Sequence, residues 1–217
     1  MIDFAAAREA MVDSQVRPSD VTAYPIIAAM LDVPREDYVP EAFRSVAYLG
    51  EHIPLAPGRV LLDPRVFAKL LNALDVSRTD LVLDVGCGLG YSTAVIARIA
   101  EAVIALEEDE ALAGEAETRI GTHSVDNAMV QTGPLTHGVA RHGPYDAILV
   151  EGGVETVPET LTDQLKEGGR IVAIFGDGHK GQARIGLKSK TGMVWRRAFD
   201  ATAPVLGGFT LSKEFEF

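Results

Sequence analysis

The chemistry-bearing part of this chain is a run of alternating glycines preceded by an acid. Residues 81–85 form a short apolar run that predicts a buried strand, and this strand delivers Asp84 to its carboxyl end. The apolar spacing of residues 91–100 then predicts a helix. Glycines between such elements let the backbone turn sharply and approach a ligand without a Cβ in the way. The turn glycines are Gly86, Gly88 and Gly90.

The spacing of these glycines separates two classes of cofactor. A dinucleotide-binding turn has a further glycine three residues after its second one, and this chain has Tyr91 there. Gly-x-Gly-x-Gly with an acid two residues ahead is instead the pattern of S-adenosylmethionine enzymes, whose ligand carries no pyrophosphate. We therefore expect S-adenosylmethionine, with S-adenosylhomocysteine as the product. The predicted contacts in this stretch are Asp84, Gly86, Cys87, Gly88, Gly90 and Tyr91.

A second carboxylate supports a nucleoside ligand. Residues 102–106 predict another buried strand, which ends on Glu107. An acid at the tip of the second strand, about 20 residues past the glycines, can accept hydrogen bonds from ribose hydroxyls. The alternative is that Glu107 only begins the acidic stretch 107–110 and caps the next helix.

Composition narrows the class of protein. The chain has 217 residues, of which 47% are hydrophobic and 24% charged, as in a globular protein of about one domain. Its net charge of -11 and pI near 4.9 argue against a nucleic-acid partner, which needs a basic surface. No apolar run reaches the length of a membrane span, and no signal peptide is recognisable. We expect a cytoplasmic protein, with a monomer favoured.

Cysteine and histidine usage predicts neither a disulfide nor a metal site. Cys87 is the only cysteine, so an intrachain disulfide is impossible, and a small filler between two glycines is its simplest role. His137 follows the third predicted strand and can approach the adenine side of the ligand. The other histidines show no metal-ligand spacing with one another or with Cys87; they are His52, His123, His142 and His179.

Strand and helix patterns alternate from residue 81 onward, which predicts an α/β fold: a doubly wound, mostly parallel sheet covered on both faces. Gly168-Gly169 is expected to end the last helix as a C-cap. From residue 182 the tail alternates without helical periodicity and predicts antiparallel edge strands. The further strands are expected at 128–131, 145–150 and 170–175, and the further helices up to about Ile120 and at 159–165.

The first 80 residues have a different character and predict an extension that covers the ligand site. Residues 3–16 and 22–31 have the apolar stripe of helices, and 64–74 predicts a third helix. Prolines between residues 34 and 64 break the intervening chain into loops and turns. We therefore divide the chain into an extension, 1–80, and a cofactor-binding domain, 81–217, packed as one unit.

Short motifs in a fixed order connect this chain to a known family. They include Met11-Val12, Val33-Pro34-Arg35-Glu36, Tyr38-Val39-Pro40, Ile53-Pro54-Leu55, Tyr145-Asp146-Ala147-Ile148 and Val157-Pro158, besides the glycine turn. In order and spacing the chain resembles the protein-L-isoaspartate O-methyltransferase family nearly end to end. The resemblance implies a class I methyltransferase fold with a Rossmann-like sheet. It also implies methyl transfer to a carboxylate of an isoaspartyl residue in a damaged protein or peptide.

The chain departs from that family at the substrate loop and at the cofactor edge. The family's loop reads Gly-Gln-Thr-Ile-Ser-Gln-Pro, and residues 58–64 match it with Val60 and Leu62 in place of the two hydroxyl residues. The family's Gly-Asp pair after the third strand, whose acid can face the adenine amino group, is Gly133-Pro134 here. These substitutions leave the methyl acceptor open.

Two carboxylates are candidates for catalysis. Glu151 directly follows the predicted fourth strand, where a carboxylate would lie near the transferred methyl and could act as general base for a hydroxyl, thiol or amine. Asp63, next to the lost serine, is the second candidate. A solvated or helix-capping carboxylate is the alternative for Glu151. Three functions therefore stay open: an isoaspartyl methyltransferase, a methyltransferase of a small-molecule acceptor, and a non-catalytic protein that binds S-adenosylmethionine.

Overall fold

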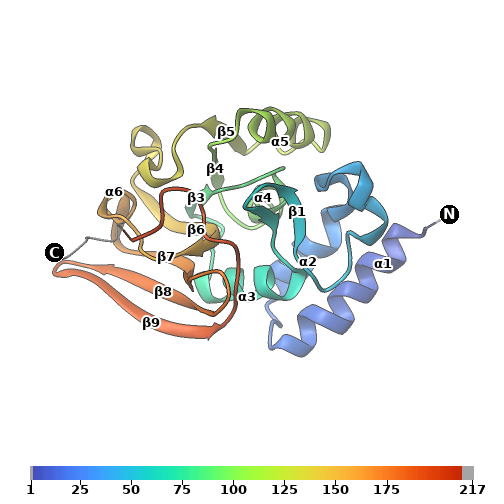
Figure 1. Cartoon of the computed structure of the whole chain (residues 1–217), viewed down its shortest axis with the longest axis horizontal. Helices are drawn as coiled ribbons and strands as arrows, with labels where there is room; N and C mark the ends of the chain where they lie inside the picture. The colour runs from blue at the N-terminus through green and yellow to red at the C-terminus, as the bar shows by residue number, and fades with distance from the viewer. Residues whose placement is uncertain (1, 212–217) are drawn as a thin grey trace, which may run out of the picture.

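One seven-stranded sheet organises the chain in the computed structural model, which describes residues 2–211 (Figure 1). The strand order is β5-β4-β3-β6-β7-β8-β9. The strands are β3 (Leu81–Val85), β4 (Ala102–Glu107), β5 (Ala128–Thr132), β6 (Tyr145–Val154), β7 (Leu165–Gly176), β8 (Gly181–Ser189) and β9 (Gly192–Asp200).

The sheet is parallel from β5 to β7 and antiparallel at one edge. β3 lies between β4 and β6 and pairs with both in parallel, with Asp84 opposite Ala105 on one side and Leu149 on the other. β7 pairs antiparallel with β8, and β8 pairs antiparallel with β9. The predicted doubly wound sheet and the antiparallel C-terminal strands are therefore confirmed.

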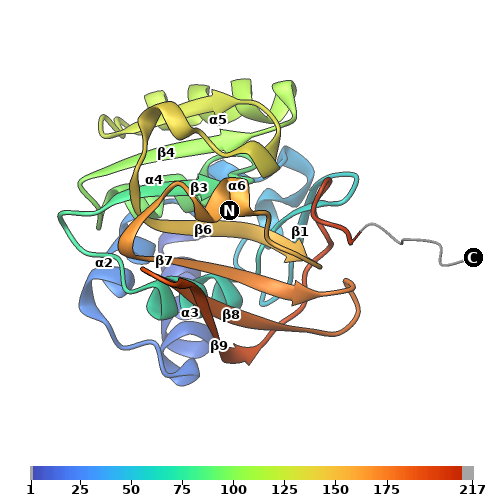
Figure 2. The same cartoon turned by 90° about the vertical axis from the view of Figure 1, so that its left-hand side faces the viewer.

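Helices cover both faces because the parallel strands are apolar on both sides. On one face, α3 (Pro64–Leu74) packs on β6 and β7, and α4 (Tyr91–Ala97) packs on β3 and β4, with α5 (Glu110–Thr122) beside β4 and β5. On the other face, the short α6 (Glu159–Thr162) contacts β7. The views in Figures 1 and 2 show these layers.

The N-terminal segment packs on the α3 side and shares its core. α1 (Phe4–Met11) continues through a π-helical turn at Val12–Val16, and α2 (Tyr24–Asp32) follows. Buried side chains from these helices belong to the same apolar cluster as side chains of β3 and β6. Short 3-10 turns then lead to a hairpin of β1 (Ile53–Ala56) and β2 (Arg59–Leu61), where only loops were expected.

The predicted boundaries around β6 and β7 are wrong. β6 continues to Val154, so Glu151 lies within the strand instead of after it. The helix expected over 159–165 ends at Thr162, and Gly168-Gly169 lies inside β7 instead of capping a helix. Pairing explains this difference: β7 meets β6 at Leu165 and again at Arg170, and the register shift between them uses Gly168 at φ +79°.

The carboxyl edge of the sheet is covered by segments from distant parts of the chain. In Figure 2, the β1–β2 hairpin and the red C-terminal segment lie together beyond the ends of β6 and β7. The C-terminal segment is fixed to β6, because Gly153 N–H donates to Pro204 O at 2.8 Å and Leu206 N–H donates to Gly153 O at 2.9 Å. Over the described range, no helix has the length and apolarity needed to cross a membrane.

Candidate functional site

The glycine turn after β3 adopts the backbone that its sequence predicts. Gly86, Gly88 and Gly90 have φ of +82°, +56° and +90°, values that residues with a Cβ rarely adopt. Gly86 N–H donates to Leu106 O at 2.8 Å, which joins the turn to the end of β4. The turn then enters α4 at Tyr91. These glycines therefore give a sharp strand-to-helix turn at the carboxyl edge.

Asp84 supports the turn from beneath. Its side chain is fully buried, and Oδ2 accepts hydrogen bonds from the hydroxyls of Ser92 and Thr93, both at 2.7 Å. Burial raises the pKa of Asp84 to about 6, although the two hydroxyls oppose that rise. Its Oδ1 has no hydrogen-bond partner within residues 2–211. Asp84 therefore joins β3 to the start of α4 and keeps one oxygen free.

Glu107 is buried at the end of β4 and is oriented by the backbone. Its Oε2 accepts from Gly88 N–H at 2.8 Å, and its Oε1 accepts from the N–H groups of Glu108 and Asp109 at 2.9 and 3.1 Å. The cap of α5 is Asp109, whose Oδ1 accepts from Ala111 and Leu112. The alternative in which Glu107 caps that helix is therefore wrong, and its carboxylate faces the glycine turn.

Arg59 is a site residue that sequence reasoning missed. From β2 it forms a two-pronged ion pair with Glu107, with Nη1–Oε1 at 2.5 Å and Nη2–Oε2 at 2.7 Å. Nη2 also donates to Gly86 O at 2.9 Å. Burial alone would lower the pKa of Arg59, but the hydrogen bonds and charge of Glu107 outweigh it and raise that pKa. The available signal was an arginine where the family has glutamine.

The side chains of Cys87 and Tyr91, the two predicted contacts with side chains in this stretch besides Asp84, are buried. Cys87 is buried, and burial raises the pKa of its thiol well above the ordinary value, so it is a packed filler. Tyr91 belongs to the apolar core, 5.5 Å from the ring of Phe67 between centroids. The guanidinium of the buried Arg35 lies 4.9 Å from the centroid of the Tyr91 ring.

Gly133 and Pro134 line a pocket of ≈ 380 Å³ beside the end of β4. Leu106 and His137 contribute to the same wall, and Gly133 N–H donates to Glu107 O at 3.0 Å. The predicted adenine-side residues are therefore next to the predicted ribose carboxylate. Gln131, Thr132 and residues 138–141 complete the lining.

The two catalytic candidates differ in their hydrogen bonds. Asp63 caps α3, because its Oδ1 accepts from Val66 N–H at 2.8 Å. Glu151 is 5% exposed, and its Oε1 has no hydrogen-bond partner in the described part of the chain. Burial raises the pKa of Glu151 well above its ordinary value, and the nearby Asp84 raises it further. Asp63 thus has a structural partner, whereas Glu151 keeps a free oxygen.

Leu62, which stands in place of the family's serine, packs in the apolar core. Its side chain is completely buried in the apolar core, and its carbonyl accepts from Arg35 Nη2 at 2.7 Å. Val60 is only half-buried. The substitution at residue 62 therefore turns this position from a possible substrate contact into a packing contact.

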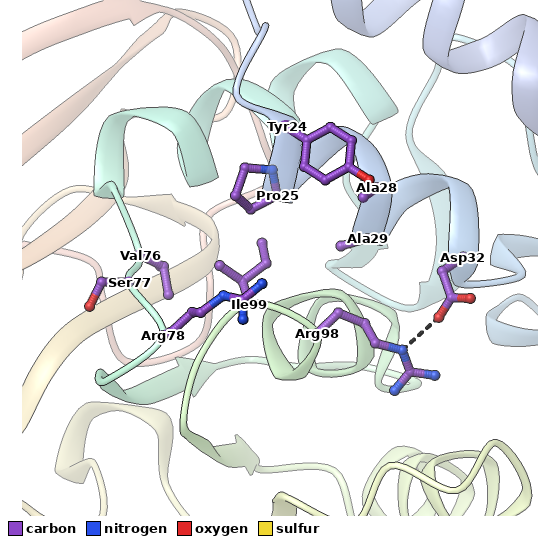
Figure 3. Close-up of a pocket in the computed structure, with 10 residues that line it drawn as sticks. All are labelled: Tyr24, Pro25, Ala28, Ala29, Asp32, Val76, Ser77, Arg78, Arg98 and Ile99. Carbon is purple, nitrogen blue, oxygen red and sulfur yellow. Dashed lines mark hydrogen bonds and ion pairs between the residues drawn. The ribbon is translucent and has the colours of Figure 1, made fainter.

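A pocket of ≈ 390 Å³ lies away from all predicted site residues (Figure 3). It is formed by α2, the segment before β3 and the end of α4. Tyr24 is 80% exposed at its rim, and Arg98 Nε pairs with Asp32 Oδ2 at 2.6 Å. Because this pocket contains none of the glycine-turn residues, we do not assign the predicted chemistry to it. Within residues 2–211, no group of three or more His, Cys, Asp or Glu side chains could hold a metal.

The residues at the turn fit the cofactor expected from the sequence. The glycines present backbone without side chains, and Glu107 points an oriented carboxylate at them, as ribose hydroxyls require. Asp84 and Glu151 each have a buried carboxylate oxygen without a hydrogen-bond partner among the residues that the structure describes. In the described conformation, however, Arg59 and Leu206 lie against the turn: a Cβ built on Gly86 would be 3.2 Å from Arg59 Nη2 and 3.6 Å from Leu206 Cδ1.

Comparisons with known proteins agree with this geometry. The family model for protein-L-isoaspartate(D-aspartate) O-methyltransferases matches residues 6–201. A protein-L-isoaspartate O-methyltransferase of Roseiflexus castenholzii is 35% identical over 98% of both chains, and one of Rhodopseudomonas palustris is 36% identical over 85% of this chain and 75% of the relative.

Solved structures give the same result for the fold. A protein-L-isoaspartate O-methyltransferase superposes with a TM-score of 0.80 at 25% identity, covering 93% of this chain and 66% of that one. A Plasmodium falciparum structure described as a beta-aspartate methyltransferase in complex with S-adenosyl-L-homocysteine has a TM-score of 0.78 at 21% identity, covering 95% and 99%. With its sheet, its glycine turn and this match over most of its length, the chain belongs to the protein-L-isoaspartate(D-aspartate) O-methyltransferase family.

Proposed function

We propose that this protein transfers a methyl group from S-adenosylmethionine to the carboxylate of an isoaspartyl residue in a damaged protein or peptide. The observation that carries the proposal is the family match over residues 6–201, on a chain whose Glu107 carboxylate is oriented toward the glycine turn. Gly86, Gly88 and Glu107 would hold the nucleoside part of the cofactor. Gly133 and Pro134 would border its base, because they line the adjacent pocket.

The chemistry demands little of the side chains. The cofactor supplies a methyl group on a positively charged sulfur. An acceptor carboxylate is ionised at neutral pH, so its oxygen attacks without losing a proton and no general base is needed. The protein must orient that oxygen in line with the methyl and exclude water. Val60 and Leu62 have no hydroxyl that could hydrogen-bond the acceptor, but the methyl transfer itself does not require one.

The test is methyl transfer to a peptide pair that differs at one bond. The protein is incubated with S-adenosylmethionine and either an isoaspartyl peptide or the same peptide with a normal aspartate. We expect S-adenosylhomocysteine to be released with the isoaspartyl peptide and not with the aspartyl one. If saturating cofactor yields no turnover with the isoaspartyl peptide, the proposed acceptor is wrong.

A second function is favoured by the free oxygen of Glu151. For a small hydroxyl, thiol or amine acceptor, a buried carboxylate with a raised pKa is a suitable general base once it has lost its proton. Glu151→Gln separates the two functions. The variant should keep isoaspartyl methylation within about threefold, because that acceptor needs no base, whereas base catalysis would lose about 10²–10⁴-fold. Binding of S-adenosylhomocysteine to both proteins controls for a damaged site.

The third function, cofactor binding without catalysis, is motivated by the same loop. It predicts that S-adenosylhomocysteine binds in calorimetry while no acceptor, peptide or small molecule, is turned over more than once. Multiple turnover with any acceptor excludes it.

A further inference from the structure

The ion pair between Arg59 and Glu107 lies where the cofactor's ribose is proposed to bind. Arg59 donates hydrogen bonds to both carboxylate oxygens of Glu107 and to Gly86 O. The side chains are 8% and 0% exposed, so water does not replace these contacts. Ribose hydroxyls would need the same oxygens. Arginine and ribose therefore compete for one set of acceptors.

Glu107 does not need Arg59 in order to keep its position. Three backbone N–H groups, from Gly88, Glu108 and Asp109, already hold the carboxylate at 2.8–3.1 Å. Arg59 itself is incompletely bonded, because its Nε is buried without a partner among the described residues. The carboxylate is thus preformed, and the guanidinium is an addition that can leave without disturbing it.

Two leucines complete the cover over the turn. A Cβ built on Gly88 would lie 2.5 Å from Leu55 Cδ1, and one built on Gly152 would lie 2.6 Å from Leu206 Cγ. Leu55 belongs to the hairpin that carries Arg59, and Leu206 to the C-terminal segment. His52 joins the two, because its Nε2 lies 2.9 Å from Thr202 O while its Nδ1 accepts from Asp63 N–H at 2.9 Å.

We propose that Arg59 is an internal competitor of the cofactor: it holds the β1–β2 hairpin closed over Glu107, and S-adenosylmethionine binds only when Arg59 has left the carboxylate. This inference rests on the proposed function, because it takes Glu107 as the ribose ligand. The apparent dissociation constant equals the intrinsic one divided by the fraction of open molecules. Arg59 therefore sets how much cofactor is needed to load the site.

Calorimetry with S-adenosylhomocysteine tests this directly on the full chain. Arg59→Gln removes the charge and restores the residue found in the family's loop, so we expect its dissociation constant to fall at least about tenfold, which is about 1.4 kcal/mol. Arg59→Lys keeps the charge but cannot pair with both carboxylate oxygens at once, so its dissociation constant should lie between those of wild type and Arg59→Gln. Arg170→Gln is the matched control: it removes an ion pair with Asp80 far from the turn and should leave the affinity unchanged.

A second measurement uses the wild-type protein and no variant. Hydrogen exchange of the segment 53–62 should speed up when S-adenosylhomocysteine is added, because the ligand displaces Arg59 and opens the hairpin. An ordinary closing loop would show slower exchange instead, and that result would overturn the proposal.

The outcomes separate this inference from the proposed function. Equal affinity of wild type and Arg59→Gln, or weaker binding by the variant, overturns the competitor role while the cofactor assignment stands. No binding by any of the proteins overturns both. Tighter binding by Arg59→Gln without methylation of isoaspartyl peptide supports the competitor role and rejects only the acceptor.

Discussion

Asp84 and Glu151 are buried on the neighbouring strands β3 and β6, and each keeps one carboxylate oxygen without a hydrogen-bond partner inside residues 2–211. Burial raises the pKa of both carboxyls; the charge of Asp84 raises the pKa of Glu151 further, and the charge of Glu107 raises that of Asp84. Two such carboxyls cannot both be ionised cheaply, so the pair binds a proton more tightly when folded than when unfolded. Burial of these carboxyls, together with the charge repulsion, therefore makes the stability of the protein depend on pH.

Asp84→Asn should become more stabilising as the pH rises. Below the ordinary carboxyl pKa of 3.8, Asp84 is protonated in both states and has no ionisation penalty; above its folded pKa of about 6, the folded protein must bury a charge. The amide oxygen can still accept from Ser92 and Thr93. We expect the variant to gain roughly 1–3 kcal/mol in unfolding free energy between pH 4 and pH 8 relative to wild type. Urea unfolding at both pH values measures this, and a difference independent of pH would contradict it.

Asp63 allows a test of capping against catalysis. Asp63→Ala removes the acceptor of Val66 N–H and should cost about 1 kcal/mol of stability. Asp63→Asn keeps a side-chain oxygen and should cost less, while it removes the negative charge. Stability and methylation rate are measured on both. A full rate with Asn shows that only the cap matters, whereas a stable but slow Asn variant would give Asp63 a direct part in the reaction.

Restoring the family's hydroxyls should cost very different amounts of stability at two nearby positions. Leu62→Ser leaves a cavity and a hydroxyl in a fully buried place, so we expect a loss of about 2–5 kcal/mol in unfolding free energy. Val60→Thr keeps the side-chain shape at a half-buried position where the added hydroxyl can reach water, so its cost should be smaller, about 0.5–2 kcal/mol. Thermal and urea unfolding compare the two variants. Equal stability would show that the Leu62 site can rearrange around a polar group.

Alanine substitutions at two glycines with similar backbone conformation distinguish the cost of backbone strain from the cost of a steric clash. Gly58 and Gly88 have φ of +71° and +56°. Within residues 2–211, a Cβ built on Gly58 has no atom within 4 Å, whereas one built on Gly88 lies 2.5 Å from Leu55 Cδ1. Gly58→Ala should therefore cost only the strain of a left-handed residue, about 1–2 kcal/mol. Gly88→Ala should cost more and also weaken S-adenosylhomocysteine binding. Calorimetry and unfolding on both variants decide; similar losses would mean that Leu55 moves freely.

The fold was predictable where one pattern governed a long segment. The β3 strand, its glycine turn and the α3 helix follow from apolar spacing and glycine placement, and the structure has them at the expected positions. The strand at residues 165–169 was not predictable, because a helix end and a bulged strand can both use Gly168-Gly169. Only pairing with β6 decides between them. Local sequence contains no information on that partner.

The carboxylates of the site could be predicted from the sequence, but the arginine that pairs with Glu107 could not. Glu107 follows from its place at a strand end, since parallel strands bring their carboxyl ends to one edge. Arg59 reaches Glu107 across 48 positions of sequence from a hairpin that was expected to be a loop, so no spacing rule connects them. Long-range ion pairs of this kind depend on tertiary packing.

The bridge between His52 and Thr202 spans 150 positions, and it connects the hairpin to a segment made after the whole sheet. The chain can therefore make this contact only after residue 202 has been synthesised. A chain cut near residue 201 would retain Glu107 and the glycine turn yet lack Leu206, which lies against that turn. We expect such a fragment to bind and release S-adenosylhomocysteine faster than the full chain, because Leu206 no longer lies against Gly86.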